Sequence, residues 1–292
     1  MYVAQFYDAI YDQYGQLKNN IANAADIRGY RVKTIKSGPM LEAEIYPIWN
    51  TAPKGIKELE KERKPTRRAQ QNLNDKNAKK TFKRYLHTNF TVADIWMTFT
   101  YKAKYLPRTI KEAQSDMVNL LRRLKRLLQK YGVNVDLLKY LYVIEGDDDG
   151  KGRRLHQHVV VNLTKIVPDE LKARMWDISF FRTLWKKGYV SLRPLEFDEF
   201  GAEGLAQYSM KDPKGAKRWG GSRNLKRPKE YIADTKISKK KISVLAKEEW
   251  MHEEFFKKLY KGYVFTDSEV YHSEYVTGAY IYVRMRDVKM EC

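Results

Sequence analysis

The sequence contains a single cysteine, Cys292, and this scarcity excludes both an intrachain disulfide and a zinc site built on cysteine thiolates. It also has no apolar run approaching the roughly 18 residues that a membrane-spanning helix needs. The first eight residues, 1–8, lack the basic and apolar regions of a secretory signal peptide. We therefore expect a protein of a reducing cytoplasm with no membrane partner.

Acidic residues are also scarce compared with basic ones. The 292 residues include 36 Asp plus Glu against 56 Lys plus Arg, a formal net charge of +20, together with 21 Tyr and 6 Trp. Such an excess of positive charge favours a polyanionic partner, and aromatic rings can stack on nucleic-acid bases. Charge alone would also permit an acidic membrane surface, but no amphipathic helix stands out as an anchor. The composition therefore favours nucleic acid.

Hydrophobic periodicity predicts both strands and helices along the chain. The predicted strands are 30–35, 41–48, 95–101, 138–145, 154–162, 189–192 and 278–285. The predicted helices are 9–25, 109–131, 168–187, 197–211 and 245–260. Between 95 and 192 the order strand, helix, strand, strand, helix, strand is typical of an α+β fold, with a central antiparallel sheet and helices on one face. We expect a basic N-terminal extension at 1–88, a core at 89–230 and a C-terminal helix and strand extension at 231–292.

Two histidines lie two residues apart in the predicted strand 154–162. Side chains two apart share one face of a strand, so His156 and His158 point together while Gln157 points the other way. The preceding strand ends at Glu145, and a loop rich in glycine and aspartate joins the two strands as a hairpin. If Glu145 lies opposite His156 or close to it, one carboxylate oxygen and two imidazole nitrogens can hold a divalent metal.

The same residues have a plainer interpretation. A His-x-His pair on a strand is also consistent with two ordinary half-buried histidines. A loop with three aspartates is most often a solvated turn. On these residues alone both interpretations stay open, because short motifs match by chance.

Tyr208 and Lys211 form a second candidate group. Residues three apart share one face of a helix, so their hydroxyl and ammonium groups address the same point within the predicted helix 197–211. A phenol, with a pKa of about 10, must be activated to act as a nucleophile, and a nearby cation favours the phenolate. The same cation can neutralise charge on a phosphorane. A surface tyrosine beside a solvated lysine is the plain alternative, but the position directly before a basic tract favours the chemical role.

Three motifs in this order resemble the HUH endonucleases. Among these, the sequence is most similar to the rolling-circle replication initiators of small phages and plasmids, particularly the filamentous-phage gene II type. The likeness spans about 89–229, and its motifs are 96–101, 154–158 and 208–211, followed by 219–225, which is similar to the family's tail. One position departs from the pattern, because Gln157 stands where the family usually has a hydrophobic residue. That departure puts the packing of this strand in question.

The resemblance implies a metal-dependent nickase for single-stranded or origin DNA, built on a ferredoxin-like HUH fold and working in a bacterial host cell. The implied metal ligands, for Mg or Mn, are His156 and His158, with Glu145 as the third. Tyr208 would become joined to the 5′ phosphate with the help of Lys211, and a free 3′ hydroxyl would prime replication.

A single tyrosine in the third motif implies one nucleophile, although Tyr189 or Tyr231 could serve a second strand transfer. The sequence has no Gly-x-x-x-x-Gly-Lys-Ser/Thr motif, so a host helicase and polymerase are the expected partners.

We predict four DNA contacts in the basic tract, with the arginines for phosphate and the tryptophan for stacking. These residues are Arg218, Trp219, Arg223 and Lys226. A solvated loop is the competing interpretation. Two other functions remain open: a non-catalytic protein that binds single-stranded nucleic acid, and an HUH transposase. Binding without cleavage would favour the first, and joining of cut ends from different DNA molecules would favour the second.

Overall fold

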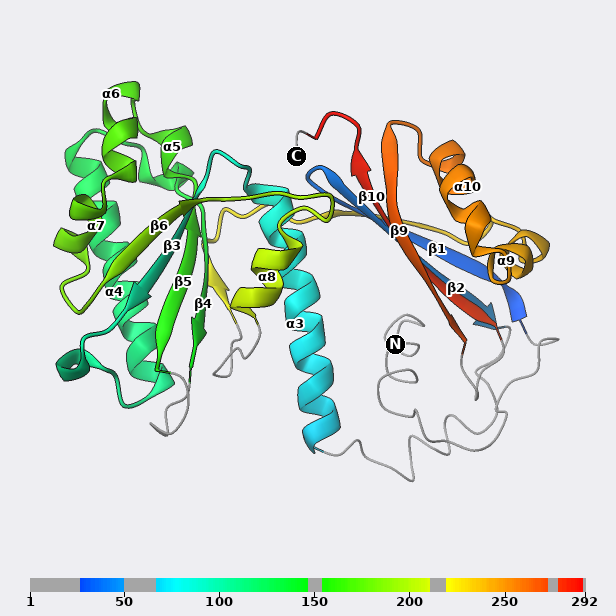
Figure 1. The fold of residues 1–292 in the computed structure, drawn as a ribbon, viewed down its shortest axis with the longest axis horizontal. Helices are drawn as coiled ribbons and strands as arrows, with labels where there is room; N and C mark the ends of the chain where they lie inside the picture. Colours follow the sequence, from blue (N-terminus) through cyan, green and yellow to red (C-terminus); the bar gives the residue numbers. More distant parts are fainter. Residues whose placement is uncertain (1–26, 50–66, 147–153, 211–218, 273–277, 291–292) are drawn as a thin grey trace. The chain divides into compact units, whose positions relative to one another are not determined.

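The computed structural model describes residues 27–49, 67–146, 154–210, 219–272 and 278–290. The chain divides into two compact units (Figure 1). One unit covers residues 78–227, and the other combines the residues before 78 with those from 228 onward. Each unit contains one five-stranded antiparallel sheet, and the fold is α+β, as the sequence predicts. No helix in the described part of the chain is long and apolar enough to cross a bilayer.

The sheet of the unit 78–227 has the strand order β6-β3-β5-β4-β7. Its strands are β3 (Ile95–Thr100), β4 (Tyr140–Glu145), β5 (His156–Val161), β6 (Val190–Pro194) and β7 (Gly220–Gly221). The first four strands follow the β-α-β-β-α-β connection of ferredoxin-like folds. The structure therefore confirms the central antiparallel sheet that the sequence predicts, and it adds the short strand β7 at the edge of β4.

Helices cover both faces of this sheet (Figure 1). The amphipathic helix α4 (Ile110–Lys130) packs Met117 and Leu121 on the face that carries Met97 and Val159. The short helices on the same side are α5 (Leu163–Ile166), α6 (Asp169–Lys172) and α7 (Ile178–Leu184). On the other face lie the end of α3 (Arg67–Asn89) and α8 (Glu203–Ser209), which pack around Trp96 and Val160. The predicted single layer of helices therefore corresponds to α4 through α7.

Three short 3-10 turns are also described in this unit: η2 (Ala103–Tyr105), η3 (Val135–Leu137) and η4 (Ala173–Trp176).

The predicted helix 168–187 is interrupted. It consists of α6, η4 and α7, because Asp177 adopts an extended conformation and caps α7 through its side chain. Asp177 Oδ1 accepts a hydrogen bond from the backbone N–H of Ser179 at 2.8 Å. Such capping satisfies a backbone donor that a new helix leaves free.

The predicted helix 197–211 was too long at its start, since only α8 is helical there. Residues 198–201 instead form a tight turn in which the backbone N–H groups of Asp198 and Gly201 donate to each other's carbonyls at 2.9 Å. Gly201 has a φ of 74°, which glycine adopts without strain. Helix α8 ends at Ser209, so the helical geometry expected to align Lys211 with Tyr208 stops before Lys211, which lies outside the described residues.

The other unit is built from the two ends of the chain. Its strands, in the order β8-β1-β2-β10-β9, are β1 (Ile27–Ser37), β2 (Met40–Trp49), β8 (Lys229–Ala233), β9 (Tyr263–His272) and β10 (Ala279–Asp287). The predicted strands 30–35, 41–48 and 278–285 are confirmed within β1, β2 and β10, whereas β8 and β9 were not predicted. The predicted helix 9–25 lies outside the described residues. The two predicted extensions thus contribute to one sheet.

Two helices, not one, pack on this second sheet. They are α9 (Lys239–Leu245) and α10 (His252–Leu259), separated by the 3-10 turn η5 (Glu249–Met251), in place of the predicted helix 245–260. The buried ring of His252 explains the break. A carbonyl can only accept, so His252 Nε2–H donates to Leu245 O at 2.7 Å and satisfies the last carbonyl of α9, while Nδ1 accepts from the Ser268 hydroxyl.

Candidate metal centre

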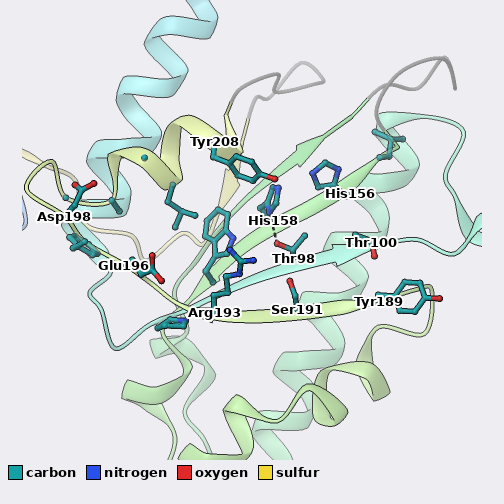
Figure 2. A pocket seen from close by; sticks show the side chains of 18 of the residues that line it. Thr98, Thr100, His156, His158, Tyr189, Ser191, Arg193, Glu196, Asp198 and Tyr208 are labelled. Atoms are coloured by element: carbon teal, nitrogen blue, oxygen red, sulfur yellow. Dashed lines mark hydrogen bonds between the residues drawn. The ribbon is translucent and has the colours of Figure 1, made fainter. Parts of the chain in front are cut away.

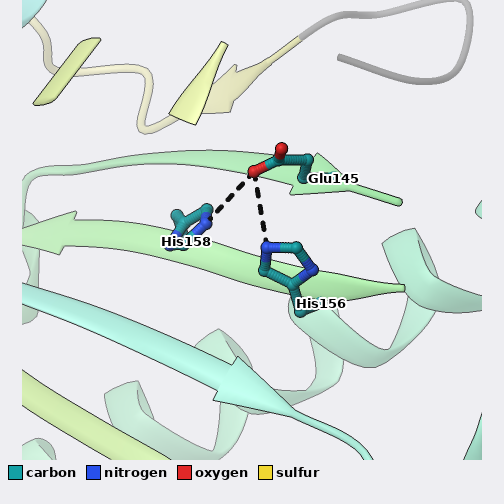
Figure 3. Close-up of side chains that lie close together, drawn as sticks. All are labelled: Glu145, His156 and His158. Atoms are coloured by element: carbon teal, nitrogen blue, oxygen red, sulfur yellow. Dashed lines mark ion pairs between the residues drawn. The ribbon is translucent and has the colours of Figure 1, made fainter. Parts of the chain in front are cut away.

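Glu145, His156 and His158 meet on the face of the sheet opposite to α4 (Figure 3). In the antiparallel pair of β4 and β5, Glu145 lies opposite His156, and Val143 lies opposite His158. The Nε2 atoms of the two rings lie 3.4 Å and 3.5 Å from the same carboxylate oxygen, Glu145 Oε2. The structure therefore confirms the predicted hairpin register, and strand alternation brings all three side chains to one point.

The ring orientation of His156 is fixed by a backbone carbonyl. His156 Nδ1 lies 3.0 Å from Arg154 O, and because a carbonyl only accepts, Nδ1 carries the proton. In the neutral ring Nε2 then presents its lone pair to the Glu145 carboxylate. The lone pairs of His156 Nε2 and Glu145 Oε2 repel each other at this distance unless a cation or a proton lies between the two atoms.

His158 is almost completely buried, with 2% of its surface exposed. Burial lowers the pKa of His158, while the adjacent Glu145 acts in the opposite direction. The neutral ring is thereby favoured. Its Nε2 is shielded from solvent and makes no hydrogen bond within the described residues. A buried nitrogen without a hydrogen bond is costly unless a ligand uses its lone pair.

The donor atoms of this triad suit a divalent cation. One oxygen and two nitrogens lie within 4.8 Å of one another, and no other group of three or more His, Cys, Asp or Glu side chains does so in the part of the chain that the structure describes. Neutral imidazole suits first-row transition metals such as Fe, Ni and Zn, carboxylate suits Mg and Mn, and three ligands leave coordination positions open. The residues present therefore fit a bound metal, and the triad could hold one.

Two residues of β3 support His158, a role that was not predicted for them from the sequence. The Trp96 ring stacks on the imidazole, with 5.3 Å between the centroids and 22° between the planes. Thr98, directly opposite His158, places its Oγ1 3.0 Å from Nδ1. When Nε2 binds a metal, Nδ1–H donates to this hydroxyl and holds the ring in place. Strand alternation from Trp96 to Thr98 was the available signal.

Gln157 points to the opposite face, as predicted, and is fully buried there. Its Nε2 donates to the Tyr101 hydroxyl at 2.6 Å and to the carbonyl of Ala113 in α4 at 2.7 Å. Burial raises the pKa of Tyr101 well above its ordinary value, so the phenol stays protonated. The polar residue at this position is thus accommodated by hydrogen bonds that tie the histidine strand to α4.

Tyr208 stands beside the triad. It projects from α8 with 60% of its surface exposed, and its ring meets that of His158 edge to face, with 5.8 Å between the centroids. Figure 2 shows its hydroxyl directed to the side of the histidines. The structure therefore brings Tyr208 and the metal ligands together, although they come from three separate elements.

An open pocket of about 1130 Å³ contains the triad's two histidines and Tyr208 (Figure 2). Its floor is the sheet, where Thr98, Thr100 and Ser191 offer small polar side chains. Its walls are α8 and the end of the edge strand β6 with the segment that follows it. The pocket has room for more than one nucleotide-sized group.

The predicted DNA contacts that the structure describes do not line this pocket. Arg218 lies outside the described residues. Trp219 is half-buried against Phe82 and Tyr85 of α3, with ring centroids 6.1 Å and 5.5 Å away. Arg223 and Lys226 are exposed beyond β7, which pairs with the start of β4. Glu145 ends β4 three to four residues beyond the residues that pair with β7, which is roughly 10–14 Å along the strand at about 3.4 Å per residue.

Comparison with known proteins identifies one family. Residues 94–213 match the family model of the replication-associated proteins of the ORF2 and gene II protein type. The matched segment runs from β3 to α8 and therefore includes Glu145, His156, His158 and Tyr208. No curated protein and no solved structure gave a significant match. The match confirms the resemblance to rolling-circle replication initiators for this segment.

Proposed function

Because residues 94–213 match the family of replication-associated proteins of the ORF2 and gene II protein type, we propose that this chain initiates rolling-circle replication by nicking single-stranded DNA at an origin. The proposed products are a DNA 5′ end joined to Tyr208 and a free 3′ hydroxyl. The hydroxyl then serves as the primer for a host polymerase, with a host helicase to unwind the duplex.

One observation carries this proposal. The Tyr208 ring lies in edge contact with His158, a member of the only described cluster that could hold a metal ion, and both side chains line the same open pocket. In-line displacement needs a nucleophile that reaches the phosphorus and a group that polarises the same phosphate, as a metal ion held at the triad would. An exposed tyrosine at this distance from the triad meets that requirement.

The proposed reaction is a transesterification. The Tyr208 oxygen forms a bond to phosphorus, and the bond between phosphorus and the 3′ oxygen breaks. The phenol loses its proton to solvent, since Tyr208 is exposed, and the departing 3′ oxygen gains one. The number of phosphodiester bonds is unchanged, so the step needs no nucleotide cofactor and can be reversed to rejoin strands.

The residues of the triad would orient the phosphate. Glu145, His156 and His158 would hold a divalent cation that withdraws charge from the non-bridging phosphate oxygens during attack. Trp96 and Thr98 keep the His158 ring in one orientation. We propose that Lys211 neutralises charge near the Tyr208 oxygen, and that Arg218, Trp219, Arg223 and Lys226 bind DNA away from the cut.

The test is a denaturing gel of the purified protein with labelled single-stranded fragments that tile the replicon encoding it. With Mn²⁺ we expect a covalent protein–DNA band that disappears in EDTA and in Tyr208→Phe. Tyr105→Phe is the matched control, because Tyr105 is also an exposed tyrosine but does not line the pocket. Binding to the fragments with no adduct on any of them would replace the nickase by a non-catalytic DNA-binding protein.

A further inference from the structure

The pocket that contains the two histidines continues across the sheet to the edge strand β6. Across the three strands β5, β3 and β6, His158 lies opposite Thr98, and Thr98 lies opposite Ser191. Two residues earlier in β3, Trp96 lies between Val160 of β5 and Arg193 of β6. The end of β6 and the residues just after it form one wall of the pocket. Neighbouring strands lie about 4.8 Å apart, so the backbone of this wall is roughly 10 Å from the histidine strand. The backbone of this wall therefore lies two strands away from the strand that carries the histidines.

Two side chains of opposite charge line this wall, Arg193 on β6 and Glu196 just after it (Figure 2). Both are exposed, and neither makes a hydrogen bond or an ion pair in the described part of the chain. Asp198 also lines the pocket, but its Oδ1 accepts the N–H of Phe200 and holds the turn there. Arg193 and Glu196 are therefore the charged groups of this wall that remain available to a ligand.

A carboxylate here is unexpected in a protein of net charge +20 that binds a polyanion. Glu196 would repel a phosphate group at this position. Glu196 belongs to no described cluster of three or more potential metal ligands, since the triad is the only such cluster in the described residues. Glu196 instead suits a neutral hydrogen-bond donor, such as the N–H groups on the edge of a nucleobase.

We propose that Arg193 and Glu196 form a base-reading subsite for a nucleotide next to the cleaved phosphate, and that guanine is the base that fits it. This inference rests on the proposed function, and it adds sequence selectivity to the same pocket. Arginine pairs in a bidentate manner with O6 and N7 of guanine, and a carboxylate can accept from its amino group. In single-stranded DNA both edges of the base are accessible.

The other bases match this wall less well or through different atoms. Adenine offers an amino group to Glu196 but has no carbonyl oxygen beside N7 for Arg193, and thymine has no amino group. Cytosine offers an amino group beside the acceptors N3 and O2 of its Watson–Crick edge, so it is the competing base that the experiment separates from guanine. Guanine is the favoured base because bidentate pairing of arginine with O6 and N7 is the commonest specific contact between a side chain and a base.

The experiment measures binding and does not depend on cleavage. Immobilised Tyr208→Phe protein in EDTA retains part of a random pool of single-stranded DNA, and the retained strands are sequenced. We expect guanine to be enriched at one position. Arg193→Ala and Glu196→Gln, each added to this background, should reduce that enrichment on the order of 10-fold at that position alone, the discrimination of one bidentate pair. Arg182→Ala and Glu170→Gln are matched controls on exposed helix positions outside the pocket and should retain it.

Three results would overturn the subsite: no base enriched at any position, enrichment that survives both substitutions, or a loss spread evenly over all positions. Enrichment of a different base that depends on Arg193 and Glu196 would overturn the assignment to guanine. The assay contains neither metal nor a nucleophile, so failure of the nicking proposal leaves its readout intact. Conversely, adduct formation without guanine selectivity would remove the subsite and leave nicking in place.

Discussion

Glu145 and His156 face each other across the β4–β5 pair, with Oε2 of one 3.4 Å from Nε2 of the other. This pairing follows from the hairpin that connects the two strands, and the two-residue alternation of β5 then adds His158 to the same face. A shift of the register by one residue would turn the carboxylate away from both rings. The candidate metal centre therefore depends on one strand pairing.

Metal binding should depend on all three members of the triad. Isothermal titration of the protein with Mn²⁺ should give one site, and His158→Ala or Glu145→Gln should weaken it by more than the 10–100-fold typical of indirect ligand support. His272→Ala is the matched control, because His272 is an exposed histidine on β9. Unchanged Mn²⁺ affinity in His158→Ala would exclude the triad as the site.

Thr98 should influence the metal through His158 without touching it. Thr98→Val preserves the shape of the side chain but removes the hydroxyl that lies 3.0 Å from His158 Nδ1. We expect Mn²⁺ affinity to fall roughly 10–100-fold, the usual effect of losing such a partner. Thr100→Val, on the same strand face, is the comparison, since no hydrogen bond joins its side chain to either ring in the described structure. Equal effects of the two substitutions would argue against this role of Thr98.

The metal-free protein should lose stability as the pH falls below about 6.5. Burial lowers the pKa of His158 in the folded state, so above the unfolded pKa of about 6.5 the ring is neutral in both states. Between that value and the folded pKa the unfolded state binds more protons, which costs up to about 1.4 kcal/mol per pH unit. As the pH is lowered, the midpoint of thermal unfolding in EDTA should fall less steeply in His158→Asn than in the wild type. His272→Asn should keep the wild-type slope, and a wild-type slope in His158→Asn would contradict the prediction.

Gly188 should be essential for the junction between β3 and β6. An added Cβ would lie 1.9 Å from the carbonyl oxygen of Thr100, where the backbones of Thr100 and Tyr189 exchange hydrogen bonds. Gly188→Ala should therefore reduce the free energy of unfolding by about 3 kcal/mol, as overpacking against fixed backbone does. Gly204→Ala, whose Cβ would meet nothing within 4 Å, should be neutral or stabilising because alanine favours the helix α8. Urea unfolding of both variants decides this, and equal midpoints would be inconsistent with the packing at Gly188.

The candidate site could be predicted from the sequence because its signals are local. The hairpin from Glu145 to His156 spans a short loop, and strand alternation directs the two histidines to one face and Gln157 to the other. The partners of Gln157 were not predictable, since Tyr101 and Ala113 approach it only through the packing of α4. Local patterns do not report such contacts.

In the second sheet, contacts that local sequence patterns do not report determine much of the strand pairing. Val32 on β1 pairs with Ala233 on β8, and Ile45 on β2 pairs with Ile281 on β10, both far apart in the chain. Periodicity detects a strand but not its distant partner, so the two ends of the chain were predicted as separate extensions. The predicted helix boundaries were wrong for a different reason. Asp177 caps a new helix and Gly201 lies in a turn, although the segments around both residues have a helical composition.

The most direct test of the account is to locate the covalent bond. The adduct with single-stranded DNA is digested with nuclease and with a protease that cleaves after glutamate, which separates Tyr189 from Tyr208 because Glu196, Glu199 and Glu203 lie between them. Mass spectrometry should then find the mass of the remaining nucleotide on the peptide that contains Tyr208, and the DNA released should end in a 3′ hydroxyl. A nucleotide on Tyr189, on Tyr231 or on no tyrosine would contradict the assignment of Tyr208 as the nucleophile.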